Sequence, residues 1–300
     1  MRIARYRRRD ADAAELGIVT GDHLVPIASL TGFGGLDADS DTGIVEAAAR
    51  LRELGSSAVT DAIDNSDHEG RVLIADVDLL APVKRPPKFL AIGLNYAEHI
   101  DETGRDKPAF PTFFNKQSTC VTGSGPASPI VLPAVSEMVD YEGELGLVIG
   151  RRCRNVATED ALSAVAGYLV VNDVSARDWQ YKAPTWTLGK SFDTHGPIGP
   201  WLVTADEVPD PQDLRLRTTV NGDLRQDATT AAMITSCAEQ ISILSTVFTL
   251  EPGDVLATGT PSGVGMARTP PAFLVHGDVV RIEIDGVGAI ENVATAERGA

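Results

Sequence analysis

The stretch that decides the fold is Asp140-Tyr-Glu-Gly-Glu-Leu-Gly-Leu-Val-Ile-Gly150. It predicts a β-strand, because a period of two places four apolar side chains on one face: Tyr141, Leu145, Leu147 and Ile149. Glu142 and Glu144 then share the other face, where neighbouring positions lie roughly 6.5–7 Å apart. Two carboxylates at that spacing can converge on one hard cation. The alternative is a solvated polar face on a half-buried strand.

The composition excludes some classes of function. The 300-residue chain carries 26 basic and 42 acidic residues, a net charge of −16, and aromatic residues make up only 5% of it. Nucleic-acid binding usually requires a basic face with stacking rings, so this balance argues against nucleic acid as a partner. An anionic substrate would need positive charge concentrated locally, from lysine, arginine or a metal ion.

The cysteines and the apolar segments bear on the compartment. Cys120, Cys153 and Cys237 are odd in number and far apart, which predicts reduced thiols rather than a disulfide framework or a zinc site. The basic residues 1–10 are not followed by an apolar segment, unlike the start of a signal peptide. Apolar runs such as residues 167–171 are too short to span a bilayer. We therefore expect a cytoplasmic protein with no membrane partner.

A proline-rich, basic segment divides the chain. Ala81-Pro-Val-Lys-Arg-Pro-Pro-Lys88 has three prolines and three cations in eight residues, which is typical of an extended connector. We therefore expect a small α+β N-terminal domain over residues 1–83 and a second domain over residues 84–300. Short strands, Gly/Pro turns and few helices predict that the second domain is mostly β with some α and has one core.

Local patterns predict individual elements in both regions. Near the N-terminus, Gly21-Asp22 predicts a hairpin turn, and Asp41 is the expected N-cap of a helix that ends at Gly55. Another short helix is expected to begin near Ser57.

In the second region, Thr158 is the expected N-cap of a helix that Gly167 ends, before a buried strand over residues 168–171. Asn221-Gly222 and Asp285-Gly286 predict two further hairpin turns.

Asp173 follows this buried strand and supplies a third candidate ligand. A carboxylate at the end of a buried strand is costly unless a cation compensates it. With Glu142 and Glu144 it would complete an oxygen triad of the kind that Mg²⁺ or Mn²⁺ prefers, with positions left for water and substrate. The alternative is an Asx-turn, because Ser175 and Arg177 follow Asp173.

His99 and Glu102 are three residues apart on an expected helical turn, so they face the same way. A carboxylate that accepts one imidazole proton leaves the other ring nitrogen free to act as a base toward water. The alternative is an exposed pair in a solvated loop.

Several enzyme classes lack their motifs. Gly189-Lys-Ser191 resembles part of a P-loop, but a Walker motif needs glycine at position 184, where the chain has Pro184. The sequence has no Gly-x-Gly-x-x-Gly after a strand, no His-Glu-x-x-His and no Gly-x-Ser-x-Gly. Nucleotide enzymes, zincins and serine hydrolases are therefore not leading candidates.

Five motifs in a fixed order resemble the fumarylacetoacetate hydrolase family. They are Gly93-Leu-Asn-Tyr-Ala-Glu-His99, Asp140-Tyr-Glu-Gly-Glu144, Val171-Asn-Asp-Val-Ser-Ala-Arg-Asp-Trp-Gln180, Gly189-Lys-Ser-Phe-Asp193 and Leu250-Glu-Pro-Gly-Asp-Val-Leu-Ala-Thr-Gly-Thr-Pro261. The resemblance is close over about residues 84–300, and many bacterial members also carry a small N-terminal domain. It implies a mixed β-sandwich or β-roll in the large domain, and a homodimer.

The resemblance also implies roles for individual residues. Glu142, Glu144 and Asp173 would bind Mg²⁺ or Mn²⁺. His99 and Glu102 would form a catalytic dyad on a lid segment over residues 98–108. Lys190 would lie beside the metal and steady the carboxylate or the developing enolate. Four residues would line the substrate pocket: Lys116, Arg177, Gln180 and Thr260.

The activity implied by the resemblance is Mg²⁺-dependent hydrolysis of a C–C bond in an acylpyruvate-type 2,4-diketo acid, with water activated by His99 and Glu102. Two alternatives use the same site without water attack: decarboxylation of oxaloacetate, and isomerisation of a 2-oxo or 2-hydroxy dienoic dicarboxylic acid. A non-enzymatic metal-binding scaffold is the third. The sequence leaves His195 and the segment Tyr181-Lys-Ala-Pro-Thr-Trp-Thr187 unassigned.

Overall fold

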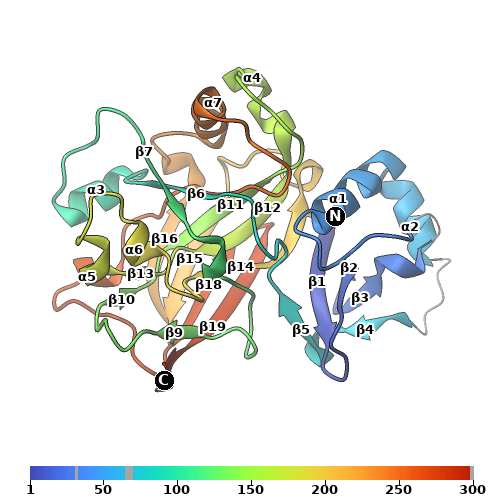
Figure 1. Ribbon diagram of the computed structural model, residues 1–300, viewed down its shortest axis with the longest axis horizontal. Helices are drawn as coiled ribbons and strands as arrows, with labels where there is room; N and C mark the ends of the chain where they lie inside the picture. The colour runs from blue at the N-terminus through green and yellow to red at the C-terminus, as the bar shows by residue number, and fades with distance from the viewer. Residues whose placement is uncertain (31–32, 65–69, 298–300) are drawn as a thin grey trace.

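A twelve-stranded mixed sheet is the frame of the computed structural model, which describes residues 1–30, 33–64 and 70–297 (Figure 1). Its strands are β1 Arg2–Arg8, β2 Ala14–Thr20, β3 His23–Pro26, β4 Val72–Leu73, β5 Val77–Leu80, β6 Phe89–Gly93, β7 Thr112–Lys116, β8 Val121–Thr122, β11 Gly143–Ile149, β12 Val165–Asn172, β14 Gly196–Thr204 and β17 Val255–Ala257. The main path runs β4-β3-β2-β1-β14-β12-β11-β17-β6-β7, while β5 pairs with β1 and β8 pairs with β14.

A five-stranded sheet packs against the central strands of the large one. Its strands are β9 Ile130–Leu132, β15 Arg215–Val220, β16 Asp223–Thr229, β18 Val279–Ile284 and β19 Gly288–Ala296, in the order β16-β15-β18-β19-β9. A separate two-stranded ladder joins β10 Val139–Asp140 to β13 Ser175–Ala176. The mostly β fold predicted from the sequence, with its sandwiched large region, is confirmed.

The helices lie outside the two sheets, and α1 packs against the large one (Figure 1). They are α1 Gly43–Leu54, α2 Ser56–Asp64, α3 Ala97–Thr103, α4 Thr158–Ala161, α5 Arg177–Gln180, α6 Thr187–Lys190 and α7 Cys237–Val247. Among the described residues, no helix is long and apolar enough to cross a membrane.

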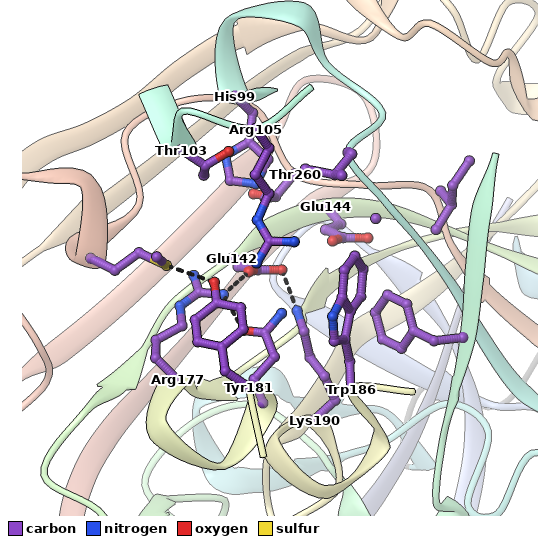
Figure 2. Close-up of a pocket in the computed structure, with 16 residues that line it drawn as sticks. His99, Thr103, Arg105, Glu142, Glu144, Arg177, Tyr181, Trp186, Lys190 and Thr260 are labelled. Atoms are coloured by element: carbon purple, nitrogen blue, oxygen red, sulfur yellow. Dashed lines mark hydrogen bonds and ion pairs between the residues drawn. The ribbon is translucent and has the colours of Figure 1, made fainter. Parts of the chain in front are cut away.

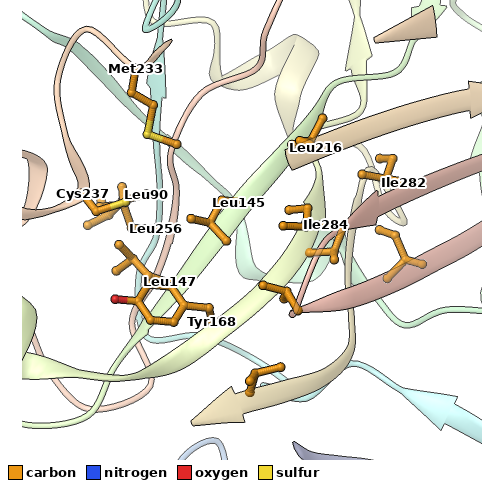
Figure 3. Close-up of a cluster of buried hydrophobic side chains, with 14 of the residues drawn as sticks. Leu90, Leu145, Leu147, Tyr168, Leu216, Met233, Cys237, Leu256, Ile282 and Ile284 are labelled. Carbon is orange, nitrogen blue, oxygen red and sulfur yellow. The ribbon is translucent and has the colours of Figure 1, made fainter. Parts of the chain in front are cut away.

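The main core fills the space between the two sheets (Figure 3). Leu145 and Leu147 of β11 belong to the same buried cluster as Leu216, Ile282 and Ile284 of the smaller sheet. The opposite face of the large sheet is also covered, since Val148 belongs to a second buried cluster that includes residues of α1. The half-buried, solvated strand considered from the sequence is therefore wrong: every residue of β11 is buried.

The N-terminal strands extend the large sheet, because β1 pairs with β14 through Arg2↔Val203 and Ile3↔Leu202. The hairpin at Gly21-Asp22 forms as expected, with Thr20 opposite His23. The domain boundary at residue 83 stays a prediction. The three cysteines are buried, free thiols.

Two helix boundaries differ from the sequence-based expectation. The N-cap of α1 is Thr42 rather than Asp41, and its side chain makes no capping bond. The helix expected to run to Gly167 is only the single turn α4 with a 3-10 turn at Leu162–Ala164. The chain is already extended from Val165, because Ile149 of β11 pairs with that residue and recruits it into the ladder. The hairpin turns at Asn221-Gly222 and Asp285-Gly286 form as predicted.

Candidate active site

A pocket lies at the end of β11, between α3, α5 and α6 (Figure 2). The cavity is small, with a volume of about 30 Å³. It is lined by sixteen residues, seven of which were predicted as site residues: His99, Glu142, Glu144, Arg177, Gln180, Lys190 and Thr260.

The three predicted ligands converge beside this pocket. Glu142 lies just before β11, Glu144 lies within it, and Asp173 follows β12. The antiparallel pairing brings them together, because Asp173 N–H donates to Glu142 O at 2.9 Å. One carboxylate oxygen from each residue lies within 4.8 Å of the others, and all three residues are buried. Asp173 itself is not among the residues that line the pocket.

Lys190 lies between two of these carboxylates. Its ammonium donates to Glu142 Oε2 and to Asp173 Oδ2, each at 2.7 Å. Burial alone would raise the pKa of Glu142, but the charges of Lys190 and Arg177 lower it below its ordinary value. Burial, followed by the charges of Asp173 and Glu142, raises the pKa of Glu144 well above its ordinary value. Glu144 is therefore the member of the triad whose charge is least compensated by protein groups.

This donor set fits a divalent cation. Three clustered carboxylate oxygens are the hard ligands that Mg²⁺ and Mn²⁺ prefer, and backbone N–H of Gly259 holds Glu144 Oε2 at 2.7 Å. A cation there would compensate Glu144 in place of a proton. Glu142, Glu144 and Asp173 would hold it.

The predicted histidine pair is formed on α3. His99 Nδ1 and Glu102 Oε1 are 2.7 Å apart, and His99 is buried rather than lying in a solvated loop. Glu102 stands behind the imidazole, outside the pocket wall, and its Oε2 accepts N–H of Gly263 at 2.8 Å. With Nδ1 engaged by Glu102, the imidazole presents Nε2 as its remaining ring nitrogen.

Arg177 is held by carboxylates on two sides. Its Nη1 donates to Glu142 Oε1 at 2.5 Å, while its Nε and Nη2 donate to Asp140 Oδ2 at 2.9 and 2.8 Å. The same Nη1 donates to Gln180 Oε1 at 3.0 Å. Asp140 belongs to the stretch that predicted β11, yet no role was predicted for it. Its position two residues before the candidate ligand Glu142 is the sequence feature that could have identified it.

Two predicted substrate residues have other partners. Thr260 lines the pocket, but its hydroxyl donates to Gly143 O at 3.0 Å and accepts from Gln226 Nε2 at 2.7 Å. Lys116 lies outside the pocket wall, where it donates to Asp173 Oδ1 at 2.6 Å and to the carbonyl of Lys190. The ammonium of Lys116 thus contacts the acidic cluster, and its substrate-binding role stays a prediction.

A cation and two aromatic rings in the pocket were missed. The guanidinium of Arg105 lies 5.1 Å from the ring centroid of Tyr181 and 5.7 Å from that of Trp186. Figure 2 shows Arg105 reaching toward Glu142 from the α3 side, opposite the two rings. The rings come from the segment that the sequence left unplaced. Arg105 follows Glu102 by three residues in the expected lid, a spacing that could have suggested it.

His195, which the sequence left unassigned, is a core residue. It is fully buried, and its Nε2 lies 3.0 Å from Val131 O. Burial, together with the charge of Lys116, lowers the pKa of His195 to about 3, so its imidazole is neutral.

The sequence and the fold match known proteins. The family model "Fumarylacetoacetate (FAA) hydrolase C-terminal" matches residues 88–295. The chain is 41% identical over 298 residues to the mitochondrial oxaloacetate tautomerase fahd2 of Xenopus laevis, covering 97% of this chain and 89% of that protein.

Two solved structures have the same fold. One is maleylpyruvate hydrolase from Sphingobium sp. SYK-6, in complex with manganese(II) and pyruvate, with a TM-score of 0.81 and 34% identity over 99% of this chain and 100% of that one. The other is 2-hydroxyhepta-2,4-diene-1,7-dioate isomerase from Mycobacterium marinum, with a TM-score of 0.74 and 33% identity over the whole of both chains.

Proposed function

The chain belongs to the fumarylacetoacetate hydrolase family of enzymes, and from that premise we propose that it is a Mg²⁺- or Mn²⁺-dependent hydrolase of an acylpyruvate-type 2,4-diketo acid. The observation that carries this proposal is the position of His99. The imidazole, fixed by Glu102, faces the same small pocket as two members of the buried carboxylate triad, Glu142 and Glu144. A base and a cation site that share one pocket can act on one substrate.

The pocket supports binding of a 2-oxo acid. A divalent cation held by the triad would act as a Lewis acid on that acid and offset the negative charge that develops on it. Lys190 and Arg177, both in the pocket wall, add fixed positive charge next to the same position. Local charge of this kind is what an anion needs to enter a protein whose net charge is −16.

The chemistry follows from the dyad. His99 Nε2 takes a proton from water while the water oxygen attacks the carbonyl carbon remote from the carboxylate. The bond between that carbon and the neighbouring CH₂ carbon then breaks. One product is a carboxylic acid, and the electron pair passes to the other product, the enolate of pyruvate, which a proton converts to pyruvate. Glu102 holds the imidazole in its reactive tautomer and stabilises its protonated form.

Arg105 favours a substrate with a second carboxylate. Within residues 1–30, 33–64 and 70–297 its guanidinium has no carboxylate partner and rests on Tyr181 and Trp186. A guanidinium that lies over aromatic rings and bonds to no carboxylate has donors available for bidentate binding of a substrate carboxylate. We therefore propose dicarboxylic acylpyruvates as the preferred class.

A second candidate activity is keto–enol tautomerisation of oxaloacetate. The Xenopus laevis relative named for that reaction is similar over nearly the whole chain. The same site would serve, because a base beside a 2-oxo dicarboxylic acid can move a proton from carbon without adding water.

One experiment separates the two activities. The purified protein with Mn²⁺ is incubated with fumarylpyruvate, acetylpyruvate and oxaloacetate, and the products are identified by NMR. Hydrolysis releases pyruvate and a second acid, whereas tautomerisation forms no new product and only speeds both the approach to keto–enol equilibrium and the exchange of the C3 protons in D₂O. Turnover of none of these acids would reject both activities, and turnover unaffected by EDTA would reject a metal-dependent mechanism.

A further inference from the structure

One loop carries backbone amides that hold two different carboxylates of the site. Gly259 N–H donates to Glu144 Oε2 at 2.7 Å, and four residues later Gly263 N–H donates to Glu102 Oε2 at 2.8 Å. We call residues 259–266 the linking loop. It joins the triad to the histidine pair through main-chain atoms.

The far end of the linking loop is fixed by a buried carboxylate. Asp140 is completely buried; its Oδ1 accepts N–H of Gly265 at 2.8 Å, and its Oδ2 accepts N–H of Met266 at 3.0 Å. Its Oδ2 also accepts two bonds from Arg177. Because charged acceptors form stronger bonds than neutral ones, this carboxylate is a firm anchor for the loop.

The next residue along the chain fixes the middle of the loop. The hydroxyl of Tyr141 donates to Gly263 O at 3.0 Å, so the peptide groups on either side of Gly263 are both engaged. Gly263 has φ +107°, and a Cβ there would lie 2.0 Å from Arg225 O. The position therefore requires glycine. Because glycine has little conformational preference of its own, the contacts of the linking loop determine the direction in which the Gly263 amide points.

We infer that Asp140 and Tyr141 are positioning residues for the His99–Glu102 dyad, acting through the amide of Gly263. Glu102 has one oxygen on His99 and the other on Gly263, so the Gly263 amide sets the plane of the carboxylate. That plane determines which imidazole nitrogen carries the proton and where the other nitrogen points. The catalytic part of this inference rests on the proposed function, whereas its structural part does not.

The deciding variant is Tyr141→Phe, because it removes the bond to Gly263 O and leaves Asp140 with Arg177. The matched control is Tyr168→Phe, which removes the hydroxyl of another tyrosine in the same core cluster, on β12. We expect kcat of Tyr141→Phe to fall about 10- to 100-fold, as for other residues that orient a catalytic group, with KM and Mn²⁺ affinity unchanged. The control should retain wild-type values.

A spectroscopic readout tests the inference without substrate or metal. The chain has five histidines, and the ¹⁵N ring signals of His99 are those lost in His99→Gln. The wild-type protein should show the proton on Nδ1 and a bare Nε2. In Tyr141→Phe the two tautomers should mix, and in Tyr168→Phe they should not.

Asp140→Asn is the second variant. It keeps the shape of the side chain but removes the negative charge that accepts hydrogen bonds from Arg177, Gly265 and Met266. The two tautomers of His99 should therefore mix more than in Tyr141→Phe. If Asp140→Asn does not fold, the Tyr141→Phe variant alone still tests the inference. Wild-type tautomers and wild-type kcat in Tyr141→Phe would overturn the inference. Absence of any 2-oxo acid turnover would reject the proposed function alone, since the tautomer measurement is independent of it.

Discussion

Lys116 Nζ donates to Asp173 Oδ1 at 2.6 Å, and neither side chain is exposed to solvent. Lys190 binds the other oxygen of the same carboxylate at 2.7 Å. The negative charge of Asp173 is therefore compensated by two ammonium groups, one on each carboxylate oxygen, without a metal or substrate. This contact indicates a stabilising role for Lys116 at the acidic cluster, while its predicted role in substrate binding stays a prediction.

Lys116→Met should cost stability rather than substrate affinity. Removing one of the two cations that contact the buried Asp173 leaves its charge to Lys190 alone, which should lower the free energy of unfolding by up to about 3 kcal/mol. Chemical denaturation in EDTA measures that loss, and KM for the preferred 2-oxo acid should stay near the wild-type value. Lys107→Met, which removes a charge from an exposed side chain, is the control. A raised KM with unchanged stability would return Lys116 to the substrate-binding role predicted from the sequence.

The stability of the metal-free protein should fall as pH rises, because of Glu144. Its folded-state pKa is raised by burial first and by Asp173 and Glu142 next, above an ordinary value of 4.5. A raised pKa means that the folded state binds the proton more tightly than the unfolded state, so this contribution is complete below pH 4.5 and is lost as pH rises through the folded-state pKa. Glu142, whose pKa is lowered, acts in the opposite sense and only below its ordinary value.

Added Mn²⁺ should remove that loss, since the cation binds the ionised form of Glu144. The increase in Tm on adding Mn²⁺ should therefore grow as pH rises above the ordinary Glu144 pKa of 4.5, measured by thermal unfolding with Mn²⁺ and with EDTA. Glu144→Gln should flatten the dependence on pH in EDTA and weaken the response to Mn²⁺. A Tm increase that is the same at every pH would contradict the hypothesis that the cation compensates the charge of Glu144.

The sequence predicted much of this site because its patterns are local. The period of two placed Leu145 and Leu147 in the core, and the i, i+3 spacing joined His99 to Glu102. Asp173 could be proposed as a ligand because it ends an apolar strand. The match of these residues to the family motifs then favoured a metal site over a polar strand face.

The sequence could not reveal the contacts that depend on the packing of distant segments. Lys116 ends β7 at one edge of the large sheet, and its side chain meets Asp173, which follows β12 and lies 57 residues later in the chain. The helix expected up to Gly167 failed for a similar reason: pairing with β11 outweighed the local helix signals. Asp140 and Arg105 were missed because their partners come from other segments of the chain.

Arg105→Gln should lower activity selectively on dicarboxylic substrates. Two acylpyruvates with the same seven-carbon chain provide the comparison: 2,4-dioxoheptanedioate, which ends in a carboxylate, and 2,4-dioxoheptanoate, which ends in a methyl group. Loss of a charge-assisted bond of about 1.5–3 kcal/mol should lower kcat/KM about 10- to 100-fold for the first acid and little for the second.

Lys107→Gln is the matched control for Arg105→Gln. It makes the same change of charge two residues further along, and its side chain is outside the wall of the pocket. Equal losses on both substrates, or the same loss in Lys107→Gln, would show that Arg105 does not recognise the second carboxylate.

Gly93→Ala should disturb the aromatic wall that supports Arg105. A Cβ at Gly93 would lie 2.3 Å from Cζ3 of Trp186, and the indole is further confined by an edge contact with Phe114 at 5.6 Å between ring centroids. Trp186 also has φ +60°, a conformation that costs a non-glycine residue about 1 kcal/mol or more and that persists only when its surroundings enforce it. The added methyl group should thus displace the ring rather than the backbone.

The expected result is a modest loss of stability with a larger loss of selectivity. Overpacking of this kind costs about 1–3 kcal/mol, measured by chemical denaturation, while the ratio of kcat/KM between the two seven-carbon acids should fall toward that of Arg105→Gln. Trp186→Ala removes the clash together with the ring, so the double variant should regain stability but not selectivity. A double variant that regained both would show that Arg105 binds its carboxylate without help from Trp186, because the cation would then be held in place by Tyr181 alone.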